Sequence, residues 1–167
     1  MGSVAKPQKD NGANGHRVLI VDDSPLSLQL LAHLIQLHGY QAETASSGLE
    51  ALEAARRDPP DVILLDIMMP EMDGFEVAEA LKADPRTDDI PILFISALND
   101  ESSKVKAFDA GGVDYIAKPF QNREVLARVN THVKLRDTTR RLEQQLAERA
   151  KLIRRLDITN EQLQTAL

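Results

Sequence analysis

The sequence predicts an α/β fold, a doubly wound parallel sheet built from five strand and helix repeats, (βα)5. Between residues 17 and 135, short apolar runs alternate with amphipathic stretches, as strand and helix repeats require. The clearest runs contain no polar residue; they are Val18–Val21, Val62–Leu65 and Ile92–Ile95. Such runs are typical of parallel strands that helices cover on both faces.

The second expected strand differs from the others. Residues 40–44 alternate between apolar and polar side chains, which is typical of an edge strand with one face less covered. An edge position for this strand agrees with the strand order 2-1-3-4-5 of flavodoxin-like sheets. The fifth strand is expected over residues 113–117. In sheets of this type ligands bind outside the carboxyl ends of the strands, so we expect functional residues there.

Helix start signals stand between the expected strands. The pair Ser24-Pro25 predicts a helix whose leucines, from Leu26 to Leu34, form one apolar stripe. A further helix is expected around residues 101–109, before a pair of glycines. The other helices begin at predicted caps, which are Ser47 with Glu50, Asp73 with Glu76, and Asn122.

The composition excludes several classes of protein. The 167 residues include no cysteine and only four histidines, which excludes a disulfide scaffold and a thiolate metal site. A metal would be held by oxygen atoms, as Mg²⁺ is. No run approaches the roughly 18 apolar residues that cross a membrane, and no secretory leader opens the chain. We therefore expect a cytoplasmic protein without a membrane partner.

Charge and texture divide the chain into three expected segments. Residues 1–16 are polar and rich in Gly and Asn, which predicts a disordered leader. Residues 17–135 form the folded domain, and residues 136–167 form a coiled-coil helix with seven basic and five acidic residues. The rest of the chain has 13 basic and 21 acidic residues. This acidic body disfavours binding to a phosphate backbone, so no direct nucleic-acid partner is expected.

Charged and hydroxyl side chains are expected to meet at the carboxyl edge of the sheet. Asp22 and Asp23 follow the first strand, Asp66 ends the third, Ser96 ends the fourth and Lys118 follows the fifth. Three carboxylates in one place repel one another unless a cation lies between them, and Mg²⁺ meets that need. Lys118 and Ser96 could then neutralise the oxygens of a phosphoryl group. Each residue alone has a commoner structural explanation, so the joint pattern indicates the site.

Four motifs carry a resemblance to a known family. They are VLIVDD at residues 18–23, DIMMPEMDG at 66–74, Ser96-Ala97, and DYIAKPF at 114–120. Together they resemble the receiver domain of two-component response regulators, over residues 17–135. The resemblance implies that Asp66 accepts a phosphoryl group from the phosphohistidine of a histidine kinase or phosphotransfer protein.

The same resemblance implies the ligands and the switch. Asp23 would bind Mg²⁺ directly, Asp22 mainly through water, and the main-chain carbonyl of Met68 would complete the set. Ser96 and Lys118 would contact the phosphoryl group. Tyr115 matches the aromatic residue that turns inward with Ser96 on activation, and the bond Lys118-Pro119 matches one that is usually cis. A receiver of this type is a regulatory protein and not an enzyme in itself.

Two alternatives from other classes remain open. A Mg²⁺-dependent phosphohydrolase would also use Asp66 as its nucleophile, but such enzymes of the haloacid dehalogenase type place an acidic residue two positions later, where this chain has Met68. A flavodoxin-like cofactor binder would need a phosphate-cradling loop where Asp22 and Asp23 stand. Stable phosphorylation at Asp66 distinguishes the receiver from the phosphohydrolase.

The final helix is predicted to continue as a two-stranded coiled coil, because no Gly or Pro follows Pro119. Asn160 at a core position favours a two-stranded coiled coil, whereas Arg149 weakens the seam. Two domains related by a two-fold axis would make it a parallel homodimer, and a lone helix packed on its own domain is the alternative. Leu152 and Ile158 fit this register poorly. The core positions are Thr139, Leu142, Leu146, Arg149, Ile153, Leu156, Asn160, Leu163 and Leu167.

We expect this coiled coil to lead to an output domain outside the sequence. Receivers with such a helix precede diguanylate cyclases, histidine kinases, nucleotidyl cyclases and phosphatases, and no residue of this chain selects among them. The last core position, Leu167, ends the chain without a helix cap. The sequence is therefore expected to stop inside or just after a linker.

Overall fold

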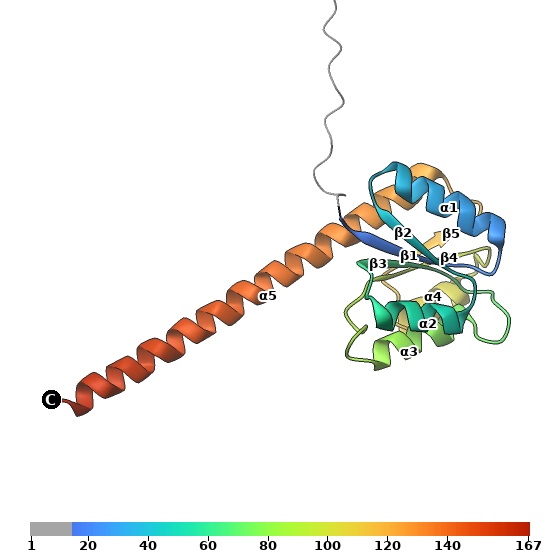
Figure 1. Ribbon diagram of the computed structural model, residues 1–167. Helices are drawn as coiled ribbons and strands as arrows, with labels where there is room; N and C mark the ends of the chain where they lie inside the picture. The colour runs from blue at the N-terminus through green and yellow to red at the C-terminus, as the bar shows by residue number, and fades with distance from the viewer. Residues whose placement is uncertain (1–14) are drawn as a thin grey trace, which may run out of the picture. The chain divides into compact units, whose positions relative to one another are not determined.

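The computed structural model describes residues 15–167, which contain one sheet of five parallel strands and five helices (Figure 1). The strand order is β2-β1-β3-β4-β5, so the predicted fold class is confirmed. The predicted leader lies outside the described residues, except for Gly15 and His16. The strands are β1 (Arg17–Val21), β2 (Gln41–Ala45), β3 (Val62–Asp66), β4 (Ile92–Ser96) and β5 (Asp114–Ala117).

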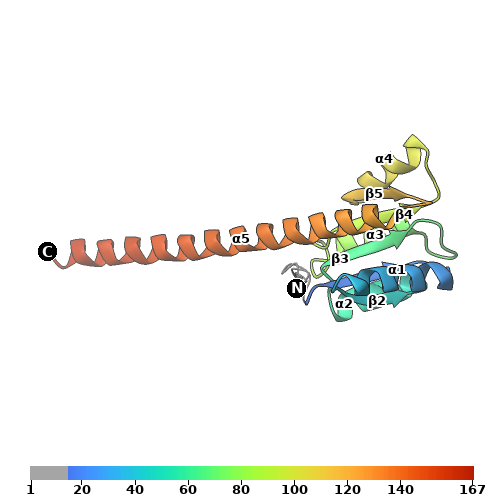
Figure 2. The ribbon, with the colours of Figure 1, turned by 90° about the horizontal axis from the view of Figure 1, so that it is seen from above.

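Helices cover both faces of the sheet (Figures 1 and 2). Helix α1 and the first turns of α5 share one core with residues such as Ile20 and Leu64, while α2, α3 and α4 share the other with residues such as Leu65 and Phe94. The helices are α1 (Pro25–Leu37), α2 (Gly48–Arg57), α3 (Gly74–Ala83), α4 (Glu101–Asp109) and α5 (Asn122–Thr165).

Burial along the strands follows their place in the sheet. Every residue of β3 and β4 is buried, as the uninterrupted apolar runs predict. Strand β2 pairs only with β1, and Gln41 and Thr44 on it are exposed. The edge position predicted from its alternating pattern is therefore confirmed.

The helix caps agree with the sequence in part. Asp73 and Glu76 form the predicted reciprocal capping box of α3. The Ser47 hydroxyl accepts a hydrogen bond from the Glu50 N–H at 3.2 Å, but the Glu50 carboxylate binds Ser46 instead of completing a box with Ser47. Asn122 is wrong as a cap, because it is the first helical residue of α5.

The apolar stripe predicted for α1 is correct only on the side that faces the sheet. Leu31, Leu34 and Ile35 are buried, whereas Leu26 and Leu30 are 65% and 61% exposed. Leucines cover more of the helix circumference than one sheet face can bury. The exposed ones need another explanation, because a leucine gains little by facing water.

The described chain falls into two compact units, of which the first ends at Val133 and the second is Lys134–Leu167. Within the first unit, Val125, Val129 and Val133 of α5 are buried in the core. The second unit is helical to Thr165, and all its side chains from Thr138 onward are exposed. In residues 15–167, no helix is long and apolar enough to cross a membrane.

Candidate functional site

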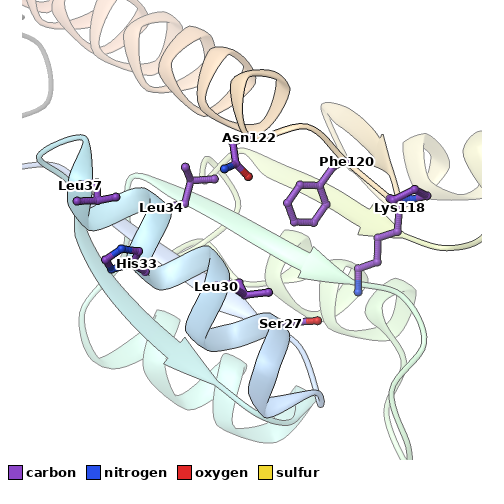
Figure 3. Close-up of a pocket in the computed structure, with 9 residues that line it drawn as sticks. Ser27, Leu30, His33, Leu34, Leu37, Lys118, Phe120 and Asn122 are labelled. Carbon is purple, nitrogen blue, oxygen red and sulfur yellow. The ribbon is translucent and has the colours of Figure 1, made fainter.

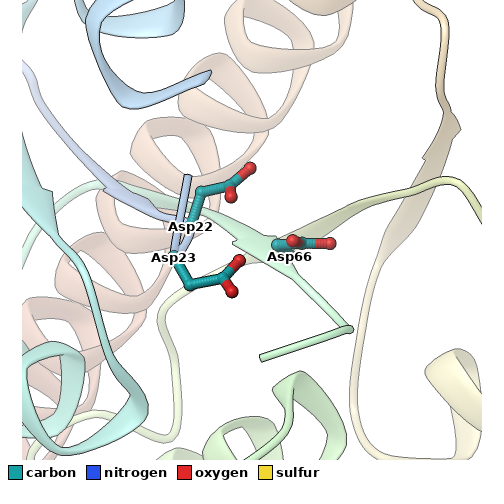
Figure 4. A group of neighbouring side chains, drawn as sticks. All are labelled: Asp22, Asp23 and Asp66. Atoms are coloured by element: carbon teal, nitrogen blue, oxygen red, sulfur yellow. The ribbon is translucent and has the colours of Figure 1, made fainter. Parts of the chain in front are cut away.

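Three carboxylates from two strand ends lie together at the carboxyl edge of the sheet (Figure 4). Asp22 and Asp23 follow β1, and Asp66 is the last residue of β3. One oxygen from each carboxylate lies within 4.8 Å of the others. Asp22 and Asp66 are buried and Asp23 is exposed, so the cluster opens to solvent on one side.

Lys118 is the cation that already faces this cluster. It follows β5 directly and precedes Pro119 through a cis peptide bond. Its Nζ donates a hydrogen bond to Asp22 Oδ2 at 3.0 Å and lies 3.8 Å from Asp66 Oδ2. Asp22 also accepts a hydrogen bond from the Ser24 N–H at 2.9 Å, so Lys118 neutralises Asp22 more directly than it does Asp66.

The electrostatics of Asp66 reflect this unequal share. The pKa of Asp66 is raised from 3.8 to about 6: burial is the largest cause, Lys118 opposes it, Asp22 adds to it, and the N–H groups of Met68 and Ile67 act to lower it. A carboxylate in this position is unstable as a bare anion. A hard cation placed among the three carboxylates would relieve the repulsion, so the residues present fit Mg²⁺.

The backbone around Asp66 is held by the start of α3. The Gly74 N–H donates to the Ile67 carbonyl at 2.8 Å. A Cβ atom at Gly74 would lie 2.3 Å from the Asp66 carbonyl oxygen, so this position requires glycine for close approach. The capping box of Asp73 and Glu76 fixes the same helix start. The loop that carries Asp66 is thereby tied to a rigid element.

A hollow lined mostly by apolar side chains lies next to Asp23 of the acidic cluster. Met68 is 59% exposed, and it lines this open hollow of about 430 Å³ together with Leu98, Pro70 and Phe75. Asp23 and Asp73 also line this hollow. The polar side chains among those that line the hollow are thus two carboxylates, Asp23 and Asp73.

Ser96 and Tyr115 are linked through the main chain of Leu98. The fully buried Ser96 accepts a hydrogen bond from the Leu98 N–H at 3.2 Å, and the Tyr115 hydroxyl donates to the Leu98 carbonyl. Tyr115 is 8% exposed, and Lys104 of α4 lies 5.9 Å from the centre of its ring. Burial, the largest cause, raises the pKa of Tyr115 above 10.0, so its hydroxyl stays protonated as a donor.

The structure thus brings Asp22, Asp23 and Asp66 together with Lys118, and it places Ser96 at the end of the neighbouring strand β4. The Met68 main-chain carbonyl and the phosphoryl contacts of Ser96 stay predictions. Sequence reasoning missed the ion pair between Lys118 and Asp22, because it assigned Asp22 to Mg²⁺ and Lys118 to the phosphoryl group. It also missed the role of Gly74, although the Asp73-Gly74 pair after a strand was a usable signal.

Sequence reasoning also missed a groove on the α1 side of Lys118 (Figure 3). Leu30, Leu34 and Leu37 of α1 line it opposite Phe120, and the groove has a volume of about 450 Å³. The polar residues that line it are Ser27, His33, Lys118 and Asn122. Two exposed leucines of α1, Leu30 and Leu37, therefore form part of a shaped surface next to the site, whereas Leu26 does not line it.

Three carboxylates and a lysine at the carboxyl edge of a doubly wound sheet can hold a metal ion beside an anionic group. The sequence model of one protein family, the response regulator receiver domain, matches residues 18–130, so the chain belongs to this family.

Two relatives and one solved structure show how far the likeness extends. The chain is 40% identical over 121 residues to the DNA-binding dual master transcriptional regulator RpaA of Synechocystis sp., covering 72% of this chain and 50% of that protein. It is 43% identical over 113 residues to the response regulator MprA of Mycobacterium leprae, covering 68% of this chain and 49% of that protein. The chain thus spans about half the length of these curated relatives.

The solved structure of the chemotaxis protein CheY4 from Vibrio cholerae superposes with a TM-score of 0.67 at 34% identity. The match covers 70% of this chain and 97% of CheY4. The likeness therefore covers a complete receiver fold. DNA binding is named for RpaA, and this chain covers only half of that protein.

Proposed function

We propose that the chain is a phosphorylation-dependent receiver in which Asp66 takes a phosphoryl group from the phosphohistidine of a histidine kinase or phosphotransfer protein. The observation that carries this proposal is the cluster itself: Asp66 lies beside Asp22 and Asp23 with its pKa raised to about 6 and with Lys118 at 3.8 Å. This arrangement favours the binding of a cation, and ionisable groups with shifted pKa values of this kind cluster at functional sites.

The transfer follows from the positions of these side chains. An Asp66 carboxylate oxygen attacks the phosphorus, the phosphorus–nitrogen bond of the donor breaks, and the imidazole leaves with the electron pair and takes up a proton. Lys118 is close enough to neutralise an oxygen of the transferred group. Bound Mg²⁺, held by Asp23 and Asp66 with Asp22 and the Met68 carbonyl nearby, would neutralise the charge of the phosphoryl oxygens.

Acetyl phosphate in the presence of Mg²⁺ tests this proposal without a partner kinase. Intact-protein mass spectrometry is expected to show one phosphoryl group on the wild type and none on Asp66→Asn. The exposed Asp88→Asn variant is the matched control and should be phosphorylated like the wild type. Phosphorylation of Asp66→Asn to the wild-type extent would refute Asp66 as the acceptor, and many turnovers of phosphate release would instead favour a phosphohydrolase.

The helix beyond the first unit supports a second part of the proposal, a parallel homodimer that passes the signal to an output domain. Its apolar side chains are uncovered: Leu142, Leu146, Ile153, Leu156 and Leu163 are each between 55% and 65% exposed. Apolar residues at heptad spacing are stabilised when a second helix covers them. A diguanylate cyclase, histidine kinase, nucleotidyl cyclase or phosphatase would be the output.

Sedimentation tests the homodimer. The full chain is expected to be a dimer at tens of micromolar, whereas a version that ends at Leu135 should be a monomer. Asn160→Leu is a useful companion, because a buried asparagine at a core position restricts the number of strands. If the full chain and the shortened version sediment alike as monomers, the coiled-coil proposal fails.

A further inference from the structure

A second cluster of charged side chains joins β5 to α5, away from the phosphoacceptor. Asp114, the first residue of β5, accepts a hydrogen bond from Arg128 Nη1 at 2.6 Å and lies 3.0 Å from His132 Nε2. The Tyr115 N–H donates to the same carboxylate at 2.9 Å. Both side chains of α5 therefore meet one carboxylate of the strand.

The two α5 residues are one helical turn apart and so lie on one face of the helix. A helix held at two points a turn apart can neither rotate nor slide without lengthening one of the contacts. Val133, the next residue after His132, ends the first compact unit. Asp114 thus holds α5 at its last turn in that unit.

The contact is shielded from water at Asp114 and His132 and is more open at Arg128, whose side chain is 40% exposed. The side chain of Asp114 is 17% exposed, and that of His132 is 15% exposed. Burial works to raise the pKa of Asp114, but the hydrogen bonds from Arg128, His132 and the Tyr115 N–H outweigh it and hold the pKa below the usual value. Charge-assisted hydrogen bonds of this kind are about twice as strong as neutral ones.

A continuous path of hydrogen bonds connects this contact to the phosphoacceptor edge. Ser96 binds the Leu98 N–H, the Leu98 carbonyl binds the Tyr115 hydroxyl, and the Tyr115 N–H binds Asp114. A movement of Ser96 toward a phosphoryl group on Asp66 would release Leu98 and with it the Tyr115 hydroxyl. Tyr115 and Asp114 are adjacent in β5, so a shift of one moves the other.

We propose that Asp114 is a positioning residue that sets the rotation of α5 through Arg128 and His132 and changes that setting when Asp66 is phosphorylated. This proposal rests on the proposed function, because phosphorylation is the input. A coiled coil depends on which helix face meets the partner, so the rotation of α5 is a quantity that an output domain could read. The contact therefore links the switch to the helix.

Amide hydrogen exchange on the full chain, with and without Mg²⁺ and beryllofluoride, tests the proposal. In the wild type, beryllofluoride is expected to protect peptides around Asp66 and to change exchange in residues 122–133 of α5 by about fivefold, the low end of typical coupling between sites. In Asp114→Asn, the protection around Asp66 should persist while the change in α5 is lost. The double variant Arg128→Gln with His132→Gln should behave in the same way.

Glu124→Gln is the matched control, because Glu124 pairs with Arg128 at 3.4 Å with its side chain 40% exposed and makes no described hydrogen bond or ion pair with Asp114. It should keep the wild-type response. If α5 responded fully in both Asp114→Asn and the double variant, with normal protection around Asp66, the role of Asp114 would be overturned and the proposed function would stand. Loss of the response around Asp66 in the wild type would overturn the proposed function, and the role of Asp114 with it.

Discussion

Asp66 and Asp114 are two carboxylates of the same sheet, both close to basic side chains, whose pKa values move in opposite directions. Burial raises the pKa of Asp66 to about 6. At Asp114 burial also acts to raise the pKa, but the donors Arg128, His132 and the Tyr115 N–H reverse the effect and lower it. Lys118, the nearest cation to Asp66, donates its hydrogen bond to Asp22 instead.

This difference indicates which of the two carboxylates is suited to bind a ligand. The chain itself supplies every partner that Asp114 needs, so that carboxylate stabilises the fold. Asp66 shares one lysine with a second buried carboxylate and stays incompletely neutralised. Groups with raised carboxylate pKa values in open clefts are where proteins bind and react with charged ligands. Under the proposed function, an external cation and a phosphoryl group would complete the surroundings of Asp66, whereas Asp114 needs neither.

The largest expected effect is on stability at Asp66. Asp66→Asn should raise the free energy of unfolding at pH 7.5, without Mg²⁺, by about 2–3 kcal/mol, since about two pKa units correspond to this difference. Because the folded-state pKa lies above the unfolded value of 3.8, wild-type stability falls as the pH rises through about 6. Below about pH 4 the variant and the wild type should converge. Urea unfolding at several pH values measures this.

The exposed Asp88→Asn variant is the control for loss of one negative charge, and it should stay within about 0.5 kcal/mol of the wild type at every pH. An Asp66→Asn protein no more stable than the wild type at pH 7.5 would mean that the chain neutralises Asp66 as completely as it does Asp114. The comparison between the two carboxylates would then be broken.

The second prediction concerns how long the phosphoryl group stays on Asp66. Its hydrolysis needs a water in line, which a polar side chain can orient. Met68, two positions after Asp66, and Leu98, two positions after Ser96, are apolar, and both line the hollow next to Asp23. The phosphorylated state should therefore be long-lived, and Met68→Asn or Met68→Glu should shorten its lifetime about tenfold, about 1.4 kcal/mol in barrier height. Phosphate release in Mg²⁺ measures the rate, with Met68→Leu as the control. A polar variant that loses phosphate no faster than the wild type would rule out this side chain as the determinant.

Most of the fold could be predicted from the sequence because its signals are local. Uninterrupted runs such as Val62–Leu65 determine buried parallel strands, and alternation in β2 determines the edge. The strand order then places Asp22, Asp23, Asp66 and Lys118 at one edge, where the structure has them. The acidic cluster follows from topology alone.

What the sequence did not predict depends on contacts between distant residues. The choice of Lys118 for Asp22 over Asp66 depends on a difference of less than 1 Å in distance, 3.0 Å against 3.8 Å. Leu26 and Leu30 carry the same helical period as buried leucines, so only the finite width of the sheet shows that they are exposed. The Asp114 cluster joins residues 14 and 18 positions apart, and no motif marks it.

The smallest expected effect is on stability at Asp114, and it should have the opposite sign. Asp114→Asn is expected to lower the free energy of unfolding at pH 7.5 by about 1 kcal/mol, which is below the usual value for charge-assisted hydrogen bonds because Arg128 is 40% exposed. The folded-state pKa of Asp114 lies below the unfolded value, so its contribution is present above about pH 4 and is lost as the pH falls through the folded-state pKa. The free energy of unfolding of Asp114→Asn in urea should therefore approach that of the wild type in acid. Asp66→Asn should also converge with the wild type there, but from higher stability, whereas Asp114→Asn does so from lower stability.

Glu124→Gln, which removes an exposed pair of the same Arg128, should change stability by no more than about 0.5 kcal/mol. If Asp114→Asn were instead more stable than the wild type at pH 7.5, Arg128 and His132 would not compensate the burial of Asp114, and the two carboxylates would belong to one class.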